Sequence, residues 1–159
     1  MASEICNISL GRMNEFAERT NDSDPTNAVF VLALIVDAAV TDNDYRDADT
    51  MSAFEAIVGA TEVTDGSYAR IILDDTDIAA STVDDTGDTR SFDIADQTWA
   101  SLAGGDAITK LVVGYDSDST AGTDANIVAV AHYDFVVTSN GGDVVAQINA
   151  SGLWQAGQV

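Results

Sequence analysis

Short apolar or alternating segments dominate the chain beyond residue 60, and polar clusters separate them. Alternation places successive side chains on opposite faces of a sheet, so these segments are typical of β-strands. The intervening Asp, Gly, Ser and Thr residues are turn formers. The predicted strands are Tyr68–Leu73, Arg90–Ile94, Ala107–Tyr115, Asn126–Phe135 and Asp143–Ile148.

The longest apolar run near the N-terminus, Ala28–Val36, is continuous over nine residues. A continuous run of this length after loop residues predicts a strand buried on both faces, with a buried helix as the alternative. The run is well short of the roughly 20 residues that a membrane-spanning helix needs. The β-branched residues within it favour the strand.

Two stretches show helical spacing. The first is Ser9–Arg19, with Leu10, Met13, Phe16 and Ala17 on one face. The second precedes Gly59, which can end it, and Asp47 or Asp49 can cap its start. Its predicted apolar face consists of Met51, Phe54, Ile57 and Val58.

Together these elements predict a mainly β fold, an antiparallel sandwich or jelly-roll-like barrel with one or two short helices. The length of 159 residues and the absence of a long linker indicate a single domain. Within it we expect an N-terminal helical arm and loop (1–26), a β-rich domain (27–152) and a C-terminal tail (153–159).

Charge narrows the possible partners. The chain has 27 acidic residues against six Lys and Arg, a formal net charge of −21. With its cations scattered singly, it has no patch to neutralise phosphates, which argues against nucleic-acid binding and anionic membrane surfaces. At 46% apolar residues it is too hydrophobic to be a disordered acidic tail. The acid excess is typical of a halophilic or marine setting or a cation-binding surface, and Asp also forms turns.

Catalytic motifs are lacking. His132, the sole histidine, falls within a predicted strand that places Asp134 on its face and Tyr133 on the other. No GxSxG-like turn is present to carry a nucleophile. Cys6 is a lone cysteine, so it cannot form an internal disulfide. We therefore expect no enzymatic activity.

One loop has the spacing of a weak cation site. Asp116 and Asp118 are separated by one residue, and Asp124 follows. Carboxylates on alternate residues suit Ca²⁺, but Ala121 stands where an EF-hand needs glycine. No cofactor is expected beyond weakly bound Ca²⁺ or other cations at this loop.

Aromatic residues supply the candidate contacts. Trp99 precedes a glycine turn and is expected to anchor it on the core. Trp154 lies near the C-terminus, where the tail either folds back on its own domain or docks on a neighbour. We favour the neighbour. The predicted interface residues are Leu153, Trp154, Phe16 and Met13.

Five segments carry a family resemblance: AVFVLALIV, DADTMSAFEAIVGA, TEVTDGSYARIIL, TWASLAGGDAITKLVVGYDSD and SNGGDVVAQINASG. From about Asn27 to Gly152 the chain resembles small structural proteins of tailed bacteriophage virions, a capsid-associated or decoration-like family. Glu62, Tyr68, Arg70, Trp99 and Lys110 lie where the pattern is strongest. From the residues alone, Arg70 and Lys110 are expected to neutralise Glu62 or nearby Asp.

The resemblance implies a non-catalytic building block that stabilises a capsid by protein contacts. Its expected partners are the major capsid protein or other virion proteins, and further copies of itself in a homo-oligomer. Its expected location is the virion after synthesis in the host cytoplasm, because the N-terminus resembles no signal peptide. The main alternative to a capsid-associated protein is a tail, collar or connector component of the virion. A less favoured alternative is a Ca²⁺-dependent extracellular binding module.

Overall fold

Strands make up most of the regular structure in the computed structural model, which describes residues 3–37, 40–149 and 152–157. The helices are the 3-10 helix η1 (Asn7–Ser9), α1 (Met13–Asn21), α2 (Asp42–Arg46) and α3 (Met51–Ala56). The strands are β1 (Ser3–Ile5), β2 (Val29–Asp37), β3 (Ala60–Glu62), β4 (Ile71–Leu73), β5 (Thr82–Asp84), β6 (Thr89–Phe92), β7 (Gln97–Trp99), β8 (Ala107–Asp116), β9 (Val128–Thr138), β10 (Val144–Ala146) and β11 (Trp154–Gly157). The mainly β, single-domain prediction is confirmed.

A six-stranded antiparallel sheet forms the centre, in the order β1-β9-β8-β2-β3, with β4 also beside β2. Along one edge β2 pairs with β8 over seven residue pairs. Along its other edge it pairs with β4 through Phe30↔Leu73 and with β3 through Ile35↔Glu62. β2 is paired on both edges and covered on both faces, and its residues are apolar up to Val36, as predicted; it ends at the partly buried Asp37.

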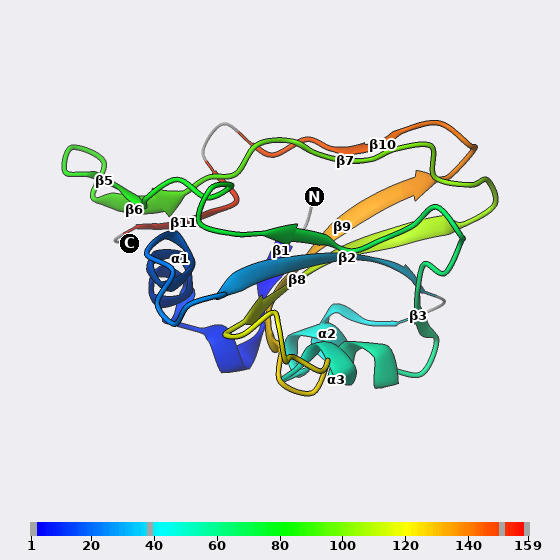
Figure 1. Ribbon diagram of the computed structural model, residues 1–159, viewed down its shortest axis with the longest axis horizontal. Helices are drawn as coiled ribbons and strands as arrows, with labels where there is room; N and C mark the ends of the chain where they lie inside the picture. The colour runs from blue at the N-terminus through cyan, green and yellow to red at the C-terminus, as the bar shows by residue number, and fades with distance from the viewer. Residues whose placement is uncertain (1–2, 38–39, 150–151, 158–159) are drawn as a thin grey trace.

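Different elements cover the two faces of the central sheet (Figure 1). Helices α2 and α3 lie on one face, and the smaller sheets β7–β10 and β5–β6–β11 lie on the other with α1. Alternate residues of β2 therefore enter different cores: Phe30, Leu32 and Leu34 face the small sheets, and Val31 and Ala33 face the helices. The two β layers form the sandwich, and the helices add a third layer.

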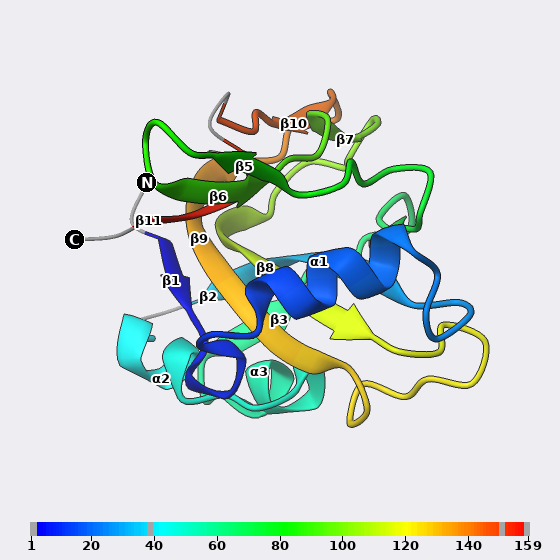
Figure 2. The same ribbon diagram turned by 90° about the vertical axis from the view of Figure 1, so that its left-hand side faces the viewer.

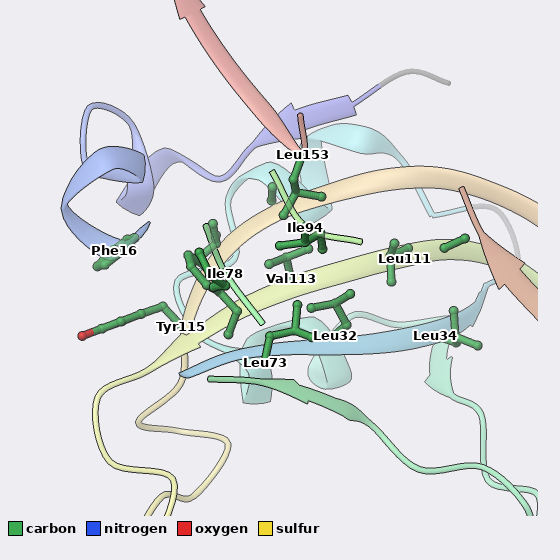
Figure 3. Close-up of a cluster of buried hydrophobic side chains, with 14 of the residues drawn as sticks. Phe16, Leu32, Leu34, Leu73, Ile78, Ile94, Leu111, Val113, Tyr115 and Leu153 are labelled. Carbon is green, nitrogen blue, oxygen red and sulfur yellow. The ribbon is translucent and has the colours of Figure 1, made fainter. Parts of the chain in front are cut away.

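The larger core lies between the β layers. Figure 3 shows Leu32, Val113 and neighbouring side chains of the central sheet beneath Ile94 and Leu153. Aromatic rings close one end, where Phe16 of α1 stacks on Tyr115 with ring centroids 4.5 Å apart. Figure 2 shows α1 running beside the sheet at this end. Burial of these groups is the main force that holds the two layers together.

A second core fills the space under α2 and α3. Tyr45 of α2 and Phe54 of α3 are both fully buried there, with ring centroids 5.9 Å apart. The close approach of α3 to β8 depends on Gly114, because a Cβ at this position would lie 3.0 Å from Cε of Met51 in α3 and 2.5 Å from Cγ2 of Ile127 before β9. The helices thus sit directly on the sheet.

The predicted second helix corresponds to α3, and α2 is a further short helix before it. Thr41 and Asp44 form a capping box at the start of α2, and the Thr50 hydroxyl accepts a hydrogen bond from the Ala53 amide at the start of α3. Predicting Asp47 or Asp49 as the cap was therefore wrong, because a threonine stands at each true N-cap. Val58 lies beyond the end of α3 and is 95% exposed, so it is not part of the apolar face.

The N-terminal segment belongs to the domain instead of forming an arm. β1 pairs with β9 in the register Ile5↔Ala131, and α1 packs its apolar face into the larger core. At the other end β11 pairs with β6, and residues 158–159 of the predicted tail lie outside the described residues. The described parts of both segments therefore complete the fold; residues 1–2 of the predicted arm also lie outside the described residues.

Candidate interaction surface

Every lysine and arginine pairs with carboxylates of the same chain. The pairs are Arg12–Glu15, Arg19–Glu15, Arg46–Glu4, Arg90–Glu18, Arg70 with Glu55, Glu62 and Asp124, and Lys110 with Asp42 and Asp134. The exposed pairs among them, such as Arg12–Glu15 and Arg19–Glu15, contribute at most about 1 kcal/mol each to stability. Their larger consequence concerns recognition, because the basic groups are engaged within the domain while the acids remain in large excess.

Arg70 is the centre of the most connected polar cluster. Its Nε donates to Glu62 at 2.8 Å, and its two terminal nitrogens reach Glu55 and Asp124. Hydrogen bonding to Glu62 raises the pKa of Arg70 further above its usual value, and hydrogen bonding to Arg70 lowers the pKa of Asp124. Burial, followed by repulsion from Asp124, raises the pKa of Glu55. One cation therefore ties α3, β3 and the β8–β9 loop together.

Tyr68 extends this cluster into the larger core. Its hydroxyl donates to Glu62 at 2.7 Å and accepts a hydrogen bond from the Leu34 amide of β2 at 3.0 Å. Nearby, the indole of Trp99 donates to the Ala69 carbonyl at 3.1 Å, and Trp99 itself is buried as predicted. The predicted pairing of Arg70 with Glu62 is confirmed, and the cluster is a structural clamp.

Lys110 is the centre of a second cluster, on the helix-covered face. It is 7% exposed, and its ammonium donates to Asp42 and Asp134, both at 2.5 Å. Burial opposes its charge, but the hydrogen bonds to the two carboxylates raise its pKa overall. The predicted neutralisation of nearby Asp by Lys110 is confirmed.

His132 lies beside this cluster and is 1% exposed. Its ring packs 5.2 Å from the Tyr45 ring, and neither ring nitrogen has a hydrogen-bond partner within the described part of the chain. Asp134 lies on the same face, as predicted, but it bonds Lys110 instead of His132. Burial, followed by repulsion from Lys110, lowers the pKa of His132. The arrangement therefore keeps the imidazole neutral and provides no His–Asp acid–base pair.

We expect replacement of His132 by leucine to reduce the loss of unfolding free energy that occurs as the pH falls. An unfolded histidine takes up a proton near pH 6.5, while the buried one resists it, so wild-type stability falls as pH drops below about 6.5. The leucine variant lacks this loss, and it also removes two unpaired nitrogens, which is expected to add about 1 kcal/mol at pH 7. Urea unfolding at several pH values would measure both effects. Parallel profiles for the two proteins would contradict the account.

The structure separates the three predicted cation ligands. Asp124 points to Arg70, while the carboxylates of Asp116 and Asp118 accept hydrogen bonds from the turn that contains them. No group of three His, Cys, Asp or Glu side chains is placed to hold a metal ion among the described residues. The prediction that Asp116, Asp118 and Asp124 share a cation site is therefore wrong, because Arg70 already neutralises the charge of Asp124.

The four predicted interface residues differ in how far they are buried within their own domain. Met13 and Phe16 are 1% and 0% exposed in their own core, so their assignment to an interface is wrong. Leu153 is also buried, and its carbonyl accepts a hydrogen bond from the Tyr133 hydroxyl at 2.8 Å. The tail thus folds back on its own domain, which was the less favoured alternative. Trp154 remains half-buried, with its ring 6.3 Å from that of Phe92.

The folded-back segment is unusual for its lack of charge. No Asp, Glu, Lys or Arg follows Asp143, which makes residues 144–159 the longest uncharged run of the sequence. We define the uncharged strip as described residues 144–149 and 152–157 together with Tyr133 and Phe135 of β9. Gln147 and Gln155 are exposed within it.

Two adjoining grooves lie along the uncharged strip. The first has a volume of about 430 Å³, and its lining includes Phe135, Gln147 and Ile148. The second has a volume of about 350 Å³ and lies between β1 and β11, against Trp154 and Gln155. Tyr133, Gly152 and Leu153 line both grooves. Their one charged lining residue is Glu4, which pairs with Arg46.

Two other hollows formed by the described residues have acids in their lining. The one beside α2 and α3 is lined by Asp44 and Asp47, and the one at the β5–β6 hairpin by Asp84, Asp85 and Asp88. The two grooves of the uncharged strip therefore suit contact with an uncharged protein surface, because they combine apolar lining groups with side-chain amides. The sequence-based prediction included Trp154 but missed Gln147, Gln155 and Tyr133. The length of the uncharged run could have indicated the two glutamines, whereas Tyr133 lies outside that run and had no such signal.

Comparisons with protein-family models, curated protein sequences and solved structures found no match to this chain. Within its described residues, none of the helices has the length and apolar character to cross a membrane.

Proposed function

We propose that this protein is a bacteriophage virion structural protein, a capsid decoration protein or another capsid-associated protein that stabilises the particle through protein contacts. The observation that carries the proposal is the uncharged strip on a molecule whose cations are all engaged internally. A subunit of this kind needs solubility before assembly, which the acidic surface supplies, and a confined surface for contact.

The two polar clusters support a structural role as well. Arg70 and Lys110 each join segments that are far apart in the sequence, and their carboxylate partners hold them in place. Such clamps restrain local opening of the fold, which suits a component that must keep its shape in a shell. The family resemblance of the sequence points the same way.

Quantitative mass spectrometry of particles purified from cells that produce this chain would test the proposal. We expect the protein to remain with the particles through density-gradient purification, at a copy number comparable with that of the main shell protein. A few copies per particle would favour a tail, collar or connector component. Recovery only in the soluble fraction would refute the proposal.

A further inference from the structure

The partner of the uncharged strip can be inferred from charge. Two copies of this chain each carry a net charge of −21, and their arginines and Lys110 are already paired internally. Like charges in close contact cost several kcal/mol, and screening in physiological salt acts only beyond about 8 Å. A second copy can therefore make close contact where the surface residues themselves carry no acid. The uncharged strip meets this condition; two acids lie beside it, Asp96, which accepts a hydrogen bond from the Ile148 amide, and Glu4, which pairs with Arg46.

The strip is also chemically self-complementary. A contact around a two-fold axis brings the same surface of both copies together, so each group must accept its own kind as a neighbour. The amides of Gln147 and Gln155 satisfy this requirement, because each offers both a donor and an acceptor. The apolar groups along the grooves, such as Phe135, Ile148 and Trp154, satisfy it as well.

The two edges of the three-stranded sheet differ in charge. Its order is β11-β6-β5, so β11 and β5 are the edge strands. Acids protect the β5 edge, since Asp84 ends the strand and Asp85 follows. The β11 edge carries no charge, and its residues Gln155 to Gly157 are exposed. Only the β11 side of this sheet thus lacks the usual protection against association.

We propose that two copies of this chain associate through their uncharged strips, strip against strip, around a two-fold axis. The occupant of the grooves is the matching surface of the second copy. This contact does not depend on a place in a virion and is tested on the isolated full-length chain, so its failure would leave the proposed function standing.

Sedimentation velocity of the wild-type chain and of a Gln147→Glu, Gln155→Glu variant would test the contact. Each substitution keeps the side-chain shape and adds one negative charge at an exposed position. We expect the wild type to form a dimer that tightens from about 0.05 M to about 1 M NaCl, because salt screens the long-range repulsion. In the variant we expect the dissociation constant to rise at least about tenfold.

A matched control adds the same charge elsewhere. Thr82→Glu with Asn126→Asp also adds two negative charges at exposed positions, and Thr82 lies on the same sheet face as Gln155 through Ser91. We expect this control to dimerise nearly as well as the wild type. Thermal melts should show that both variants fold, because none of the four side chains is buried.

A mixing experiment distinguishes a second copy from another partner. A Gln147→Lys, Gln155→Lys variant mixed with the glutamate variant should form mixed dimers, because opposite charges then meet across the same surface. A monomeric wild type at submillimolar concentration in high salt would overturn the proposal and assign the strip to a different protein. The proposal would also be overturned if the control variant dimerised as weakly as the glutamate variant. It would equally be overturned if the wild type dimerised but the lysine and glutamate variants formed no mixed dimers.

Discussion

Replacement of Phe30 by alanine is expected to lower the free energy of unfolding by about 3–5 kcal/mol. Phe30 is fully buried in the central strand β2, where its ring lies 5.6 Å from that of Phe92 and 6.1 Å from that of Tyr115. Its removal opens a cavity between the central sheet and the β5–β6–β11 sheet, which neighbouring side chains fill only in part. Chemical denaturation followed by circular dichroism would measure the loss.

Val136→Ala provides the matched control for this cavity. Val136 lies on the central sheet in β9 but is 85% exposed, so its truncation should change stability by less than about 0.5 kcal/mol. Equal losses for the two variants would mean that the layers do not pack through Phe30.

The second large effect is expected at Arg70. Its replacement by methionine keeps much of the side-chain volume but leaves Glu55, Glu62 and Asp124 together without their cation. Removal of one partner from a buried ion pair costs about 3–5 kcal/mol, and we expect about 2–4 here because the cluster is partly exposed. The loss should shrink as the pH falls, because burial raises the pKa of Glu55 and its protonation removes one of the uncompensated charges.

Two comparisons isolate the role of the cluster. Arg19→Met removes an exposed pair with Glu15 and should cost less than about 1 kcal/mol. Glu62→Gln introduced together with Arg70→Met should recover part of the loss, because it removes one of the unpaired charges. Equal effects of Arg19→Met and Arg70→Met would show that the cluster does not hold the domain together.

The long strands of the central sheet were predictable from sequence. β2, β8 and β9 run for 9 to 11 residues; β2 and β8 are buried over most of their length, and β9 is buried at residues 129–132. Local pattern is sufficient in such cases, because burial alone dictates the residue types.

Short peripheral strands were not predictable. β3, β5 and β7 have three residues each, and β5 is exposed throughout. Their pairing partners, not their own composition, make them strands, and a single sequence does not contain that information. The predicted strand Tyr68–Leu73 shows the same limit, because only Ile71–Leu73 pairs with β2.

The candidate surface was only partly predictable, for a related reason. Trp154 stood out by residue type, but whether the tail folds back depends on tertiary contacts such as the Tyr133 hydroxyl to the Leu153 carbonyl. Asp124 had suitable spacing for a cation, but Arg70, 54 residues away, occupies it. Long-range ion pairs of this kind overrule local motifs.

A reconstruction of the assembled particle by cryo-electron microscopy would test the central claim most directly. The claim is that copies of this acidic protein contact one another where their surfaces carry no charge. We predict that the uncharged strip, including Tyr133 and Gln155, is buried against a second copy of the chain, while the Asp84–Asp88 hairpin faces solvent. A map in which the strip faces solvent and the acidic loops make the protein contacts would contradict the account.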